Sequence, residues 1–229
     1  MNRLIQLRET LRLFGLAHTS IRKEDKFLLP FQNSNSFREY LLSLPDRFQE
    51  RYPARRVNSI YFDTDGKEML RQSIDGDTVK LKIRFRWYGN EVTPQAGILE
   101  LKLKEGELGT KFKKENALFS SLGCNCFRDL NQVFPGILHI RPVVFISYLR
   151  SYYQSVCGKL FITLDRDLRA SAVECDGQYN TAISLTDSLI CELKTDFSEI
   201  QQHNLTVLTL PLRKIRLSKY DFSIRALGI

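Results

Sequence analysis

Apolar and cationic residues alternate without a break from Val79 to Trp87, and this pattern constrains the fold more than any other feature. Successive side chains of a strand point to opposite faces. Lys80, Lys82, Arg84 and Arg86 therefore share one face, and apolar residues fill the other. Same-face neighbours lie roughly 6.5–7 Å apart, about the reach of successive phosphates along an extended polyanion. Surface strands usually mix charge signs because like charges repel, so this face predicts an anionic partner.

Other segments show the same alternation of apolar and charged residues, with fewer cations. On the polar faces of further predicted strands lie Arg22, Glu24 and Lys26; Glu100, Lys102 and Lys104; Lys111 and Lys113; Tyr148 and Arg150; Thr163 and Asp165; and Glu192 with Lys194. One polar face after another thus carries charge, and most of that charge is positive.

Two geometries can use such strands. In an ordinary barrel the apolar faces point inward and the charges face water. In the reverse geometry the charged faces line a lumen, and predicted helices over about 2–16, 37–44, 117–132 and 197–208 cover an outer apolar wall. Unpaired buried charges cost several kcal/mol each, so such a lumen must hold water, an anion and balancing carboxylates. We favour this geometry, and the candidate carboxylates are Glu24, Glu100, Asp165 and Glu192.

The spacing of the elements predicts an α+β fold built on an antiparallel barrel or sandwich with helices outside. Strands are predicted near residues 22–29, 57–63, 78–89, 98–105, 109–115, 143–152, 159–165, 171–175 and 189–195, and a short helix or turn over 66–74. Residues 1–20 form an N-terminal segment whose apolar spacing predicts an amphipathic helix.

Composition leaves the kind of anion open. The chain has 229 residues and a net charge of +8, which fits nucleic acid, an anionic membrane or a phosphorylated small molecule. Five scattered cysteines predict free thiols in a reducing compartment. The three histidines are dispersed, and no glycine-rich phosphate loop occurs. Neither a signal peptide nor a spanning segment is recognisable.

The charged strands also stand in an order that resembles a known family. The matching pieces are Arg22–Phe27, Ser59–Thr64, Ile83–Gly89, Leu99–Lys102, Tyr148–Arg150, Ile162–Asp165, Glu192–Lys194 and Ser218–Tyr220. Together they resemble the VTC domain, the polyphosphate polymerase branch of the triphosphate tunnel metalloenzymes, a superfamily that includes CYTH triphosphatases. The resemblance covers about residues 22–222 and makes 21–229 one tunnel domain.

The resemblance implies an eight-stranded antiparallel tunnel with a polar interior, and it assigns roles to residues. Catalytic residues would be Arg84, Arg86, Lys102, Arg150 and Glu192. Phosphates would be bound by Lys26, Lys82, Lys111, Lys113, Tyr148, Lys194, Ser218 and Lys219. Mn²⁺ or Mg²⁺ would be held by Glu192, with Glu24 and Glu100. Phe161 stands where the family often has Arg, which could weaken one phosphate subsite or favour shorter chains.

The implied activity is transfer of the γ-phosphate of ATP to a growing polyphosphate chain. Three alternatives stay open: a triphosphatase that uses water as acceptor, a non-catalytic sensor of polyphosphate or inositol phosphate, and a nucleic-acid-binding protein. The last is the weakest, because Phe85 and Trp87 lie opposite the cationic face. The resemblance further implies a cytoplasmic protein, beside a membrane-protein partner where one exists. Oligomeric state and product length are not predicted.

Overall fold

The computed structural model describes residues 17–19, 22–29, 34–91, 96–105, 108–118, 140–174, 178–180, 182–196 and 213–229. The helices predicted over 2–16 and 197–208 lie outside these residues. So does most of the helix predicted over 117–132, whose first two residues end a strand instead.

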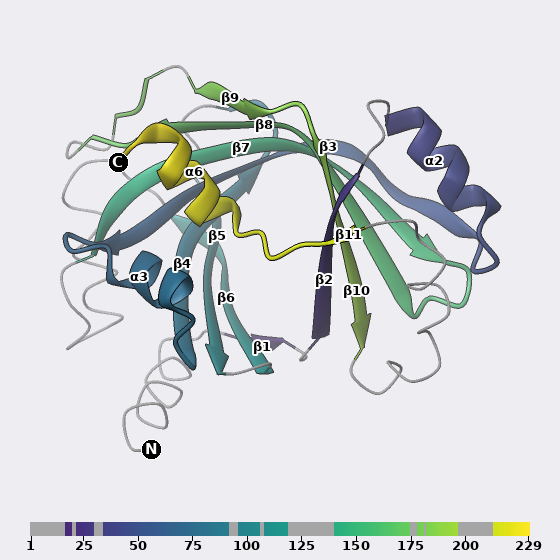
Figure 1. The fold of residues 1–229 in the computed structure, drawn as a ribbon, viewed down its shortest axis with the longest axis horizontal. Helices are drawn as coiled ribbons and strands as arrows, with labels where there is room; N and C mark the ends of the chain where they lie inside the picture. Colours follow the sequence, from purple (N-terminus) through teal and green to yellow (C-terminus); the bar gives the residue numbers. More distant parts are fainter. Residues whose placement is uncertain are drawn as a thin grey trace.

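One antiparallel sheet forms the body of the molecule (Figure 1). Its eight long strands are β2 (Arg22–Leu29), β3 (Phe48–Thr64), β4 (Val79–Tyr88), β5 (Ala96–Glu105), β6 (Leu108–Leu118), β7 (Ile140–Ser155), β8 (Leu160–Ala172) and β10 (Leu189–Asp196). Three short strands are β1 (Ala17–Thr19), β9 (Ile183–Thr186) and β11 (Arg213–Lys214). The order across the sheet is β1-β6-β5-β4-β3-β7-β8-β10-β2-β11, with β9 beside β8. This confirms the predicted antiparallel fold of eight principal strands.

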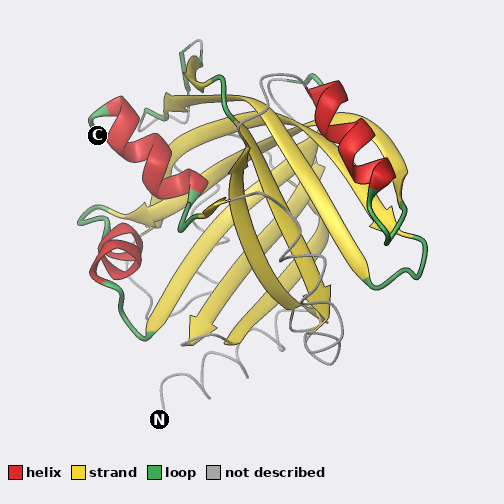
Figure 2. Ribbon diagram, turned by 45° about the vertical axis from the view of Figure 1, so that its right-hand side comes forward, coloured by secondary structure: helices red, strands yellow, loops and turns green. Residues whose placement is uncertain are grey.

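The sheet curls round so that its two ends approach one another. β1 and β2 belong to opposite ends of the strand order, yet only two residues separate them along the chain. Glu24 of β2 also pairs with Lys102 of β5 at 2.8 Å, although these strands are not neighbours in the sheet. Among the described strands no ladder joins the two ends, so the sheet is a strongly curved, incomplete barrel (Figure 2).

The apolar faces of the strands point outward, as the reverse geometry requires. Ile83 and Phe85 of β4 are fully buried in a cluster with the outward residues of β3, β5 and β6. A second outer cluster joins β2, β8 and β10 to helix α2 (Ser34–Ser43), which contributes Phe37 and Leu41. Helix α2 therefore covers part of the outer wall, close to the predicted 37–44.

The C-terminal helix α6 (Lys219–Leu227) occupies the opposite, inner face. Its Tyr220 and Ile224 pack on Val57, Ile146 and other inward residues of β3, β7, β8 and β10. The sequence analysis did not predict this helix, although Ser218 and Asp221 form the capping pattern of a helix start. Beside it lies α3 (Glu68–Asp75), which ends at Gly76 with a φ of 79°.

Three predicted strands needed correction. β3 begins at Phe48, nine residues before its predicted start. The prediction missed this first half because residues 49–55 are exposed and lack an apolar alternation. The strands predicted over 159–165 and 171–175 form one strand, β8. Its pairing with β7 shifts register around Asp167 and then continues. None of the described helices has the length and apolar character needed to cross a membrane.

The packing of α2 predicts a large loss of stability when Phe37 is truncated. Phe37→Ala removes a fully buried ring between the helix and the outer wall, which typically costs about 3–5 kcal/mol. Leu42→Ala is the matched control, since Leu42 is 47% exposed on the same helix, and it should change the free energy of unfolding by less than about 0.5 kcal/mol. Chemical denaturation of both variants measures the difference, and equal losses would contradict the packing described.

Candidate active site

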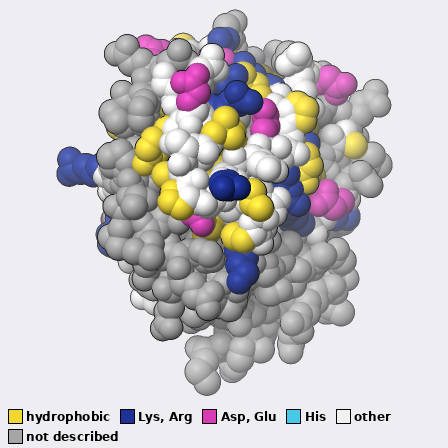
Figure 3. Space-filling model, turned by 90° about the vertical axis from the view of Figure 1, so that its right-hand side faces the viewer, with side chains coloured by type: hydrophobic (Ala, Val, Ile, Leu, Met, Phe, Trp, Pro, Cys, Tyr) yellow, Lys and Arg dark blue, Asp and Glu magenta, His cyan; other side chains and the backbone are white. Residues whose placement is uncertain are grey.

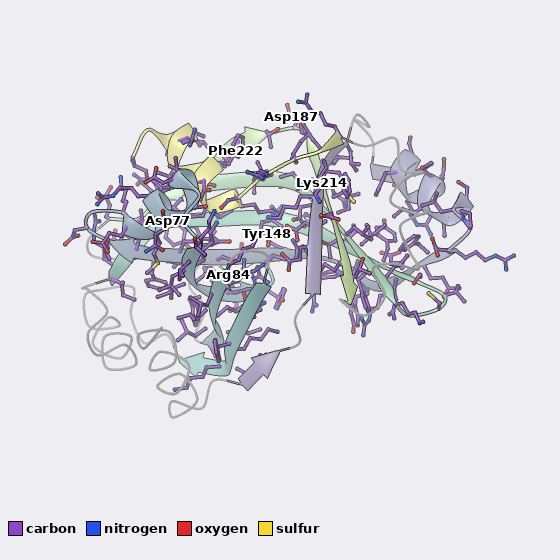
Figure 4. All side chains as sticks on the ribbon, turned by 60° about the horizontal axis from the view of Figure 1, so that its bottom comes forward. Asp77, Arg84, Tyr148, Asp187, Lys214 and Phe222 are labelled. Atoms are coloured by element: carbon purple, nitrogen blue, oxygen red, sulfur yellow. The ribbon has the colours of Figure 1, made fainter. Side chains whose placement is uncertain are left out.

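The inner face of the curled sheet gathers charged side chains from seven strands and α6. We call this set the cage. Its cations are Lys26, Lys82, Arg84, Arg86, Lys102, Lys111, Arg150, Lys194 and Lys219, and its carboxylates are Glu24, Glu100, Asp165 and Glu192. Nine cations against these four carboxylates leave five more positive than negative charges, and Asp221 of α6, 3.6 Å from Lys82 Nζ, offsets one of them. Arg84 and Tyr148 lie on this side of the sheet, between β4–β6 and β2 (Figure 4).

The strand register places like charges directly opposite one another. Lys82 of β4 is the partner of Lys102 on β5, and Lys102 is the partner of Lys111 on β6. Three lysines thus form a row across three strands. Like charges in direct opposition destabilise a sheet, so this row is a place where a bound anion would stabilise the protein.

Glu100 is the centre of the first group of ion pairs. Its carboxylate accepts a hydrogen bond from Arg84 Nε at 2.5 Å and pairs with Lys111 Nζ at 2.5 Å and Arg86 Nη1 at 3.6 Å. Burial acts to raise the pKa of Glu100, but the three cations outweigh burial and hold the pKa well below its usual range. Glu100 therefore stays charged and balances part of the cage.

Asp165 and Glu192 form the second group. Arg150 donates to both oxygens of Asp165, at 2.5 and 2.7 Å, and to Glu192 at 3.3 Å. Lys219 Nζ lies 2.6 Å from Asp165 and 2.9 Å from Glu192. Bidentate pairing of this kind fixes the guanidinium plane, so Arg150 is held rigidly on the inner face.

Tyr148 connects the two groups. Its hydroxyl accepts a hydrogen bond from Arg86 Nη2 at 3.3 Å, which leaves the phenolic proton available to donate. Arg150 and Lys219 lie over its ring at 5.1 and 4.9 Å. The predicted role, donation to a phosphate oxygen, fits this arrangement of one hydroxyl among three cations.

Helix α6 delivers Lys219 and Ser218 to the cage through a buried anchor. Asp63 accepts hydrogen bonds from the backbone N–H groups of Thr64, Met69 and Leu70, and from the hydroxyl of Tyr220 at 2.6 Å. Tyr220 also stacks on Tyr61, with ring centroids 5.4 Å apart. The anchor fixes the first turn of α6, where Ser218 caps the helix and accepts from Lys82 at 2.7 Å.

A family model described as the VTC domain matches residues 21–227. The chain belongs to the VTC domain family. The match spans every cage residue, so the VTC domain and the charged inner face are the same part of the molecule. No curated protein sequence is similar enough to match the chain.

Solved structures of CYTH-like, triphosphate tunnel proteins share the fold of this VTC domain. A candidate adenylate cyclase from Vibrio parahaemolyticus is 12% identical with a TM-score of 0.53, over 89% of this chain and 97% of that chain. A candidate adenylyl cyclase from Hippeastrum, described as having a dominant triphosphatase activity, is 14% identical with a TM-score of 0.53, over 90% and 96%. A Pyrococcus horikoshii protein is 14% identical with a TM-score of 0.50, over 89% and 98%. At such identities the likeness shows the fold alone.

Burial and neighbouring positive charges lower the pKa values of several lysines in the VTC domain. Burial, then Arg84, lower the pKa of Lys111 to about 7, although Glu100 acts in the opposite direction. Burial and Lys219 lower the pKa of Lys26 to about 8 against the pull of Glu192. The pKa values of Lys82 and Lys194 are also lowered, mainly by burial. A polyanion would reverse these shifts by stabilising the charged forms.

Three buried polar atoms near the cage have no hydrogen-bond partner among the described residues: Ser59 Oγ, Arg86 Nε and Thr163 Oγ1. Ser59 is the cross-strand partner of Arg86, and Thr163 is the partner of Glu192. Buried groups of this kind are normally satisfied, so their absence of partners marks places where phosphate oxygens or water would bind.

Membership of the triphosphate tunnel metalloenzymes implies a divalent metal. The described residues contain no cluster of three His, Cys, Asp or Glu side chains that would hold a metal alone. Glu192 lies close enough to Glu24 for its charge to act to raise the pKa of Glu24. Because Mg²⁺ and similar ions use one or two carboxylates together with substrate phosphates and water, this pair fits such an ion.

The structure brings almost all of the predicted site residues together. Lys113 is the cross-strand partner of Glu100, but its ion pair is with Glu115 at 3.9 Å. Glu100, predicted as a metal ligand, has cations as its ion-pair partners. Sequence reasoning missed Tyr61 and the Asp63–Tyr220 anchor. The available signal was their position inside two of the matched motifs, Ser59–Thr64 and Ser218–Tyr220.

Removing the charge of Glu100 should destabilise the VTC domain and make its stability depend on anions. Glu100→Gln leaves three cations uncompensated, and loss of one partner of a buried ion pair costs about 3–5 kcal/mol. Thermal unfolding with and without tripolyphosphate measures the effect, and the anion should restore more stability to the variant than to the natural protein. Glu115→Gln, with a side chain 61% exposed, is the control. An anion-independent, fully stable Glu100→Gln variant would contradict the role of Glu100.

The lowered lysine pKa values predict that anion binding takes up protons. Above pH 7 to 8 the free protein loses protons from Lys111 and then Lys26, whereas a bound anion favours their charged forms. Affinity for tripolyphosphate should therefore fall as pH rises, by at least about tenfold from pH 7 to 9. Calorimetry in buffers of different ionisation enthalpy measures the uptake. Lys111→Arg stays charged and should reduce both effects, which separates them from ionisation of the anion itself.

Proposed function

We propose that this VTC domain is a metal-dependent phosphotransferase that moves the γ-phosphoryl group of ATP to the end of a polyphosphate chain. Its family and fold support a triphosphate tunnel enzyme. The cage supplies what phosphoryl transfer demands, namely positioning and stabilisation of charge spread over phosphate oxygens. Arg84, Arg86 and Arg150 provide forked donors, and the lysines provide point charges.

The low pKa values of the cage carboxylates favour a phosphate over water as the acceptor of the phosphoryl group. Burial acts to raise the pKa of Glu24, but Lys102 and Lys194 outweigh it and the pKa is about 2. Burial is likewise outweighed by neighbouring cations at Asp165 and Glu192, whose pKa values are lowered. A general base works best with a pKa near the working pH, so these carboxylates are weak bases. Lys111 and Lys26 have lowered pKa values in the free protein, but bound phosphates would hold both lysines in their charged forms. Water must lose a proton to attack phosphorus, whereas a terminal phosphate oxygen is already anionic and needs no base.

The proposed step exchanges one P–O bond for another. A terminal oxygen of the acceptor chain attacks the γ-phosphorus of ATP, the bond from that phosphorus to the β–γ bridging oxygen breaks, and ADP leaves with the bonding electrons. Arg86, Tyr148, Arg150 and Lys219 would donate toward the transferred group. Asp165 and Glu192 hold these last two side chains in place.

Glu192, with Glu24, is the proposed holder of the divalent ion. When bound there, the ion would link phosphate oxygens and offset the charge that develops on the leaving group. The identity of the ion, Mn²⁺ or Mg²⁺, stays a prediction, as do the cytoplasmic location and the membrane-protein partner.

A triphosphatase is the second candidate, since the Hippeastrum protein with this fold is described as having that activity. The two functions share the cage and differ in the acceptor. Incubation with ATP and Mn²⁺ separates them by product. ADP with polyphosphate supports the polymerase, and ADP with inorganic phosphate supports the triphosphatase. Tight binding without turnover would support a sensor, and cyclic AMP would overturn all three.

Lys102 offers a test that spares the fold, because its side chain is 42% exposed and, among the described residues, its ion pair is with Glu24. Lys102→Ala removes one positive charge from the triphosphate path and should lower kcat/KM for ATP by about tenfold or more. Lys114→Ala is the matched control, because Lys114 is exposed on the other face of neighbouring β6. A rate for Lys102→Ala equal to that of the control would count against the cage as the catalytic centre.

A further inference from the structure

Two arginines on the first half of β3 contact aromatic rings instead of carboxylates. The Arg55 guanidinium lies 4.2 Å from the ring centroid of Tyr88, 4.9 Å from that of Tyr152 and 5.6 Å from that of Tyr52. Its Nε also donates to the Tyr152 hydroxyl at 3.3 Å. Rings orient a guanidinium without cancelling its charge.

Arg51 is held in the same way, 5.1 Å from the Tyr52 ring and 5.2 Å from the Phe161 ring. Phe161 faces inward, because it is the cross-strand partner of Lys194. The position at which the sequence analysis expected a missing cation is therefore covered by one that comes from another strand. Within the described part of the chain, neither Arg51 nor Arg55 forms an ion pair with a carboxylate.

These residues continue the inner face beyond the cage. Arg55 is the direct partner of Arg150, and Tyr152 is the partner of Thr163, so both side chains share the face that bears the cage. Register shifts on either side of Tyr52 accommodate the extra residues of β3. We call Arg51, Tyr52, Arg55, Tyr88, Tyr152 and Phe161 the mouth patch. Both arginines are exposed. On the side of the molecule that carries the start of β3, cationic side chains lie among hydrophobic ones (Figure 3).

We propose that the mouth patch is a second anion subsite, which binds the part of a polyphosphate chain that extends beyond the cage and gives the domain a preference for long chains. This proposal rests on the proposed function, since it needs a chain anchored in the cage. Arg51 lies four residues from Arg55, up to about 13 Å along the strand. A long chain of phosphates can follow that path, whereas a triphosphate held in the cage ends before it.

The geometry favours phosphates over a nucleobase as the occupant. The ring faces of the patch are in contact with guanidinium groups, while a stacked guanidinium keeps N–H donors at its edge for anion oxygens. Continuity with Arg150 also favours the anion already bound in the cage over a separate nucleic acid, which would need base-stacking faces.

The test compares the affinities of tripolyphosphate and long-chain polyphosphate over a range of salt concentrations. The natural protein should bind the long chain more tightly. The double variant Arg51→Ala/Arg55→Ala should lose most of that preference, with less than about a twofold change for tripolyphosphate. Its log–log salt slope for the long chain should fall by about one for each arginine removed. Arg38→Ala/Arg225→Ala, which removes two exposed arginines elsewhere, is the charge-matched control.

Each outcome bears on a different claim. If the natural protein fails to bind tripolyphosphate, the cage and the proposed function fail together. If tripolyphosphate binds but the double variant keeps the chain-length preference, or the control loses it equally, the mouth patch fails alone. If the double variant lost affinity for ATP but not for tripolyphosphate, the patch would bind the nucleoside of ATP. If it lost affinity for single-stranded RNA alone, the patch would bind nucleic acid. Either result would overturn the proposal.

Discussion

The excess of positive charge on one face of a curled sheet is the constraint on which the rest of the structure depends. Nine cations share that face with four carboxylates, and three of the lysines stand in direct opposition. Such a face would repel itself in a dry interior. It is stable because each carboxylate contacts at least one cation, and because lysines such as Lys26 and Lys82 keep about a quarter of their side chains exposed to water.

The fold meets this constraint by separating its two kinds of packing. The outward faces of the strands form apolar clusters, one of which α2 covers. The inward face is apolar where α6 packs against it. The rest of this face carries the charged side chains of the cage. Asp63 ties the two parts together, since a single buried carboxylate fixes the start of α3 and, through Tyr220, the start of α6. Because Asp63 lies outside the cage and acts through Tyr220, a substitution at Asp63 would disturb Lys219 indirectly.

Sequence patterns predicted the strands whose two faces differ in polarity. The alternation from Val79 to Trp87 was enough to put Arg84 and Arg86 on one face and the apolar residues on the other. The choice of the inward side rested in addition on the run of like charges and on the resemblance to the VTC domain. The same logic failed on residues 49–55, where neither face is apolar, and hence it missed Arg51 and Arg55. It also missed α6, whose inner-face packing depends on partners far away in the chain. Contacts such as Arg51 over Phe161 join strands that are not neighbours in sequence, and no local pattern encodes them.

The two ways of holding arginine divide the anion path into parts with different capabilities. Arg84 and Arg150 are paired with carboxylates, which fix their geometry and reduce the net charge, as a transition state with defined atomic positions requires. Arg51 and Arg55 rest on rings, which leave the charge intact and the side chains open to water. If the proposed polymerase function holds, a product chain that slides along this face needs attraction without fixed positions, which stacked arginines can supply. The proposed chemistry and the proposed binding of the outer chain would thus occupy separate parts of one continuous face, because the carboxylates paired with Arg84, Arg150 and Lys219 lie in the cage.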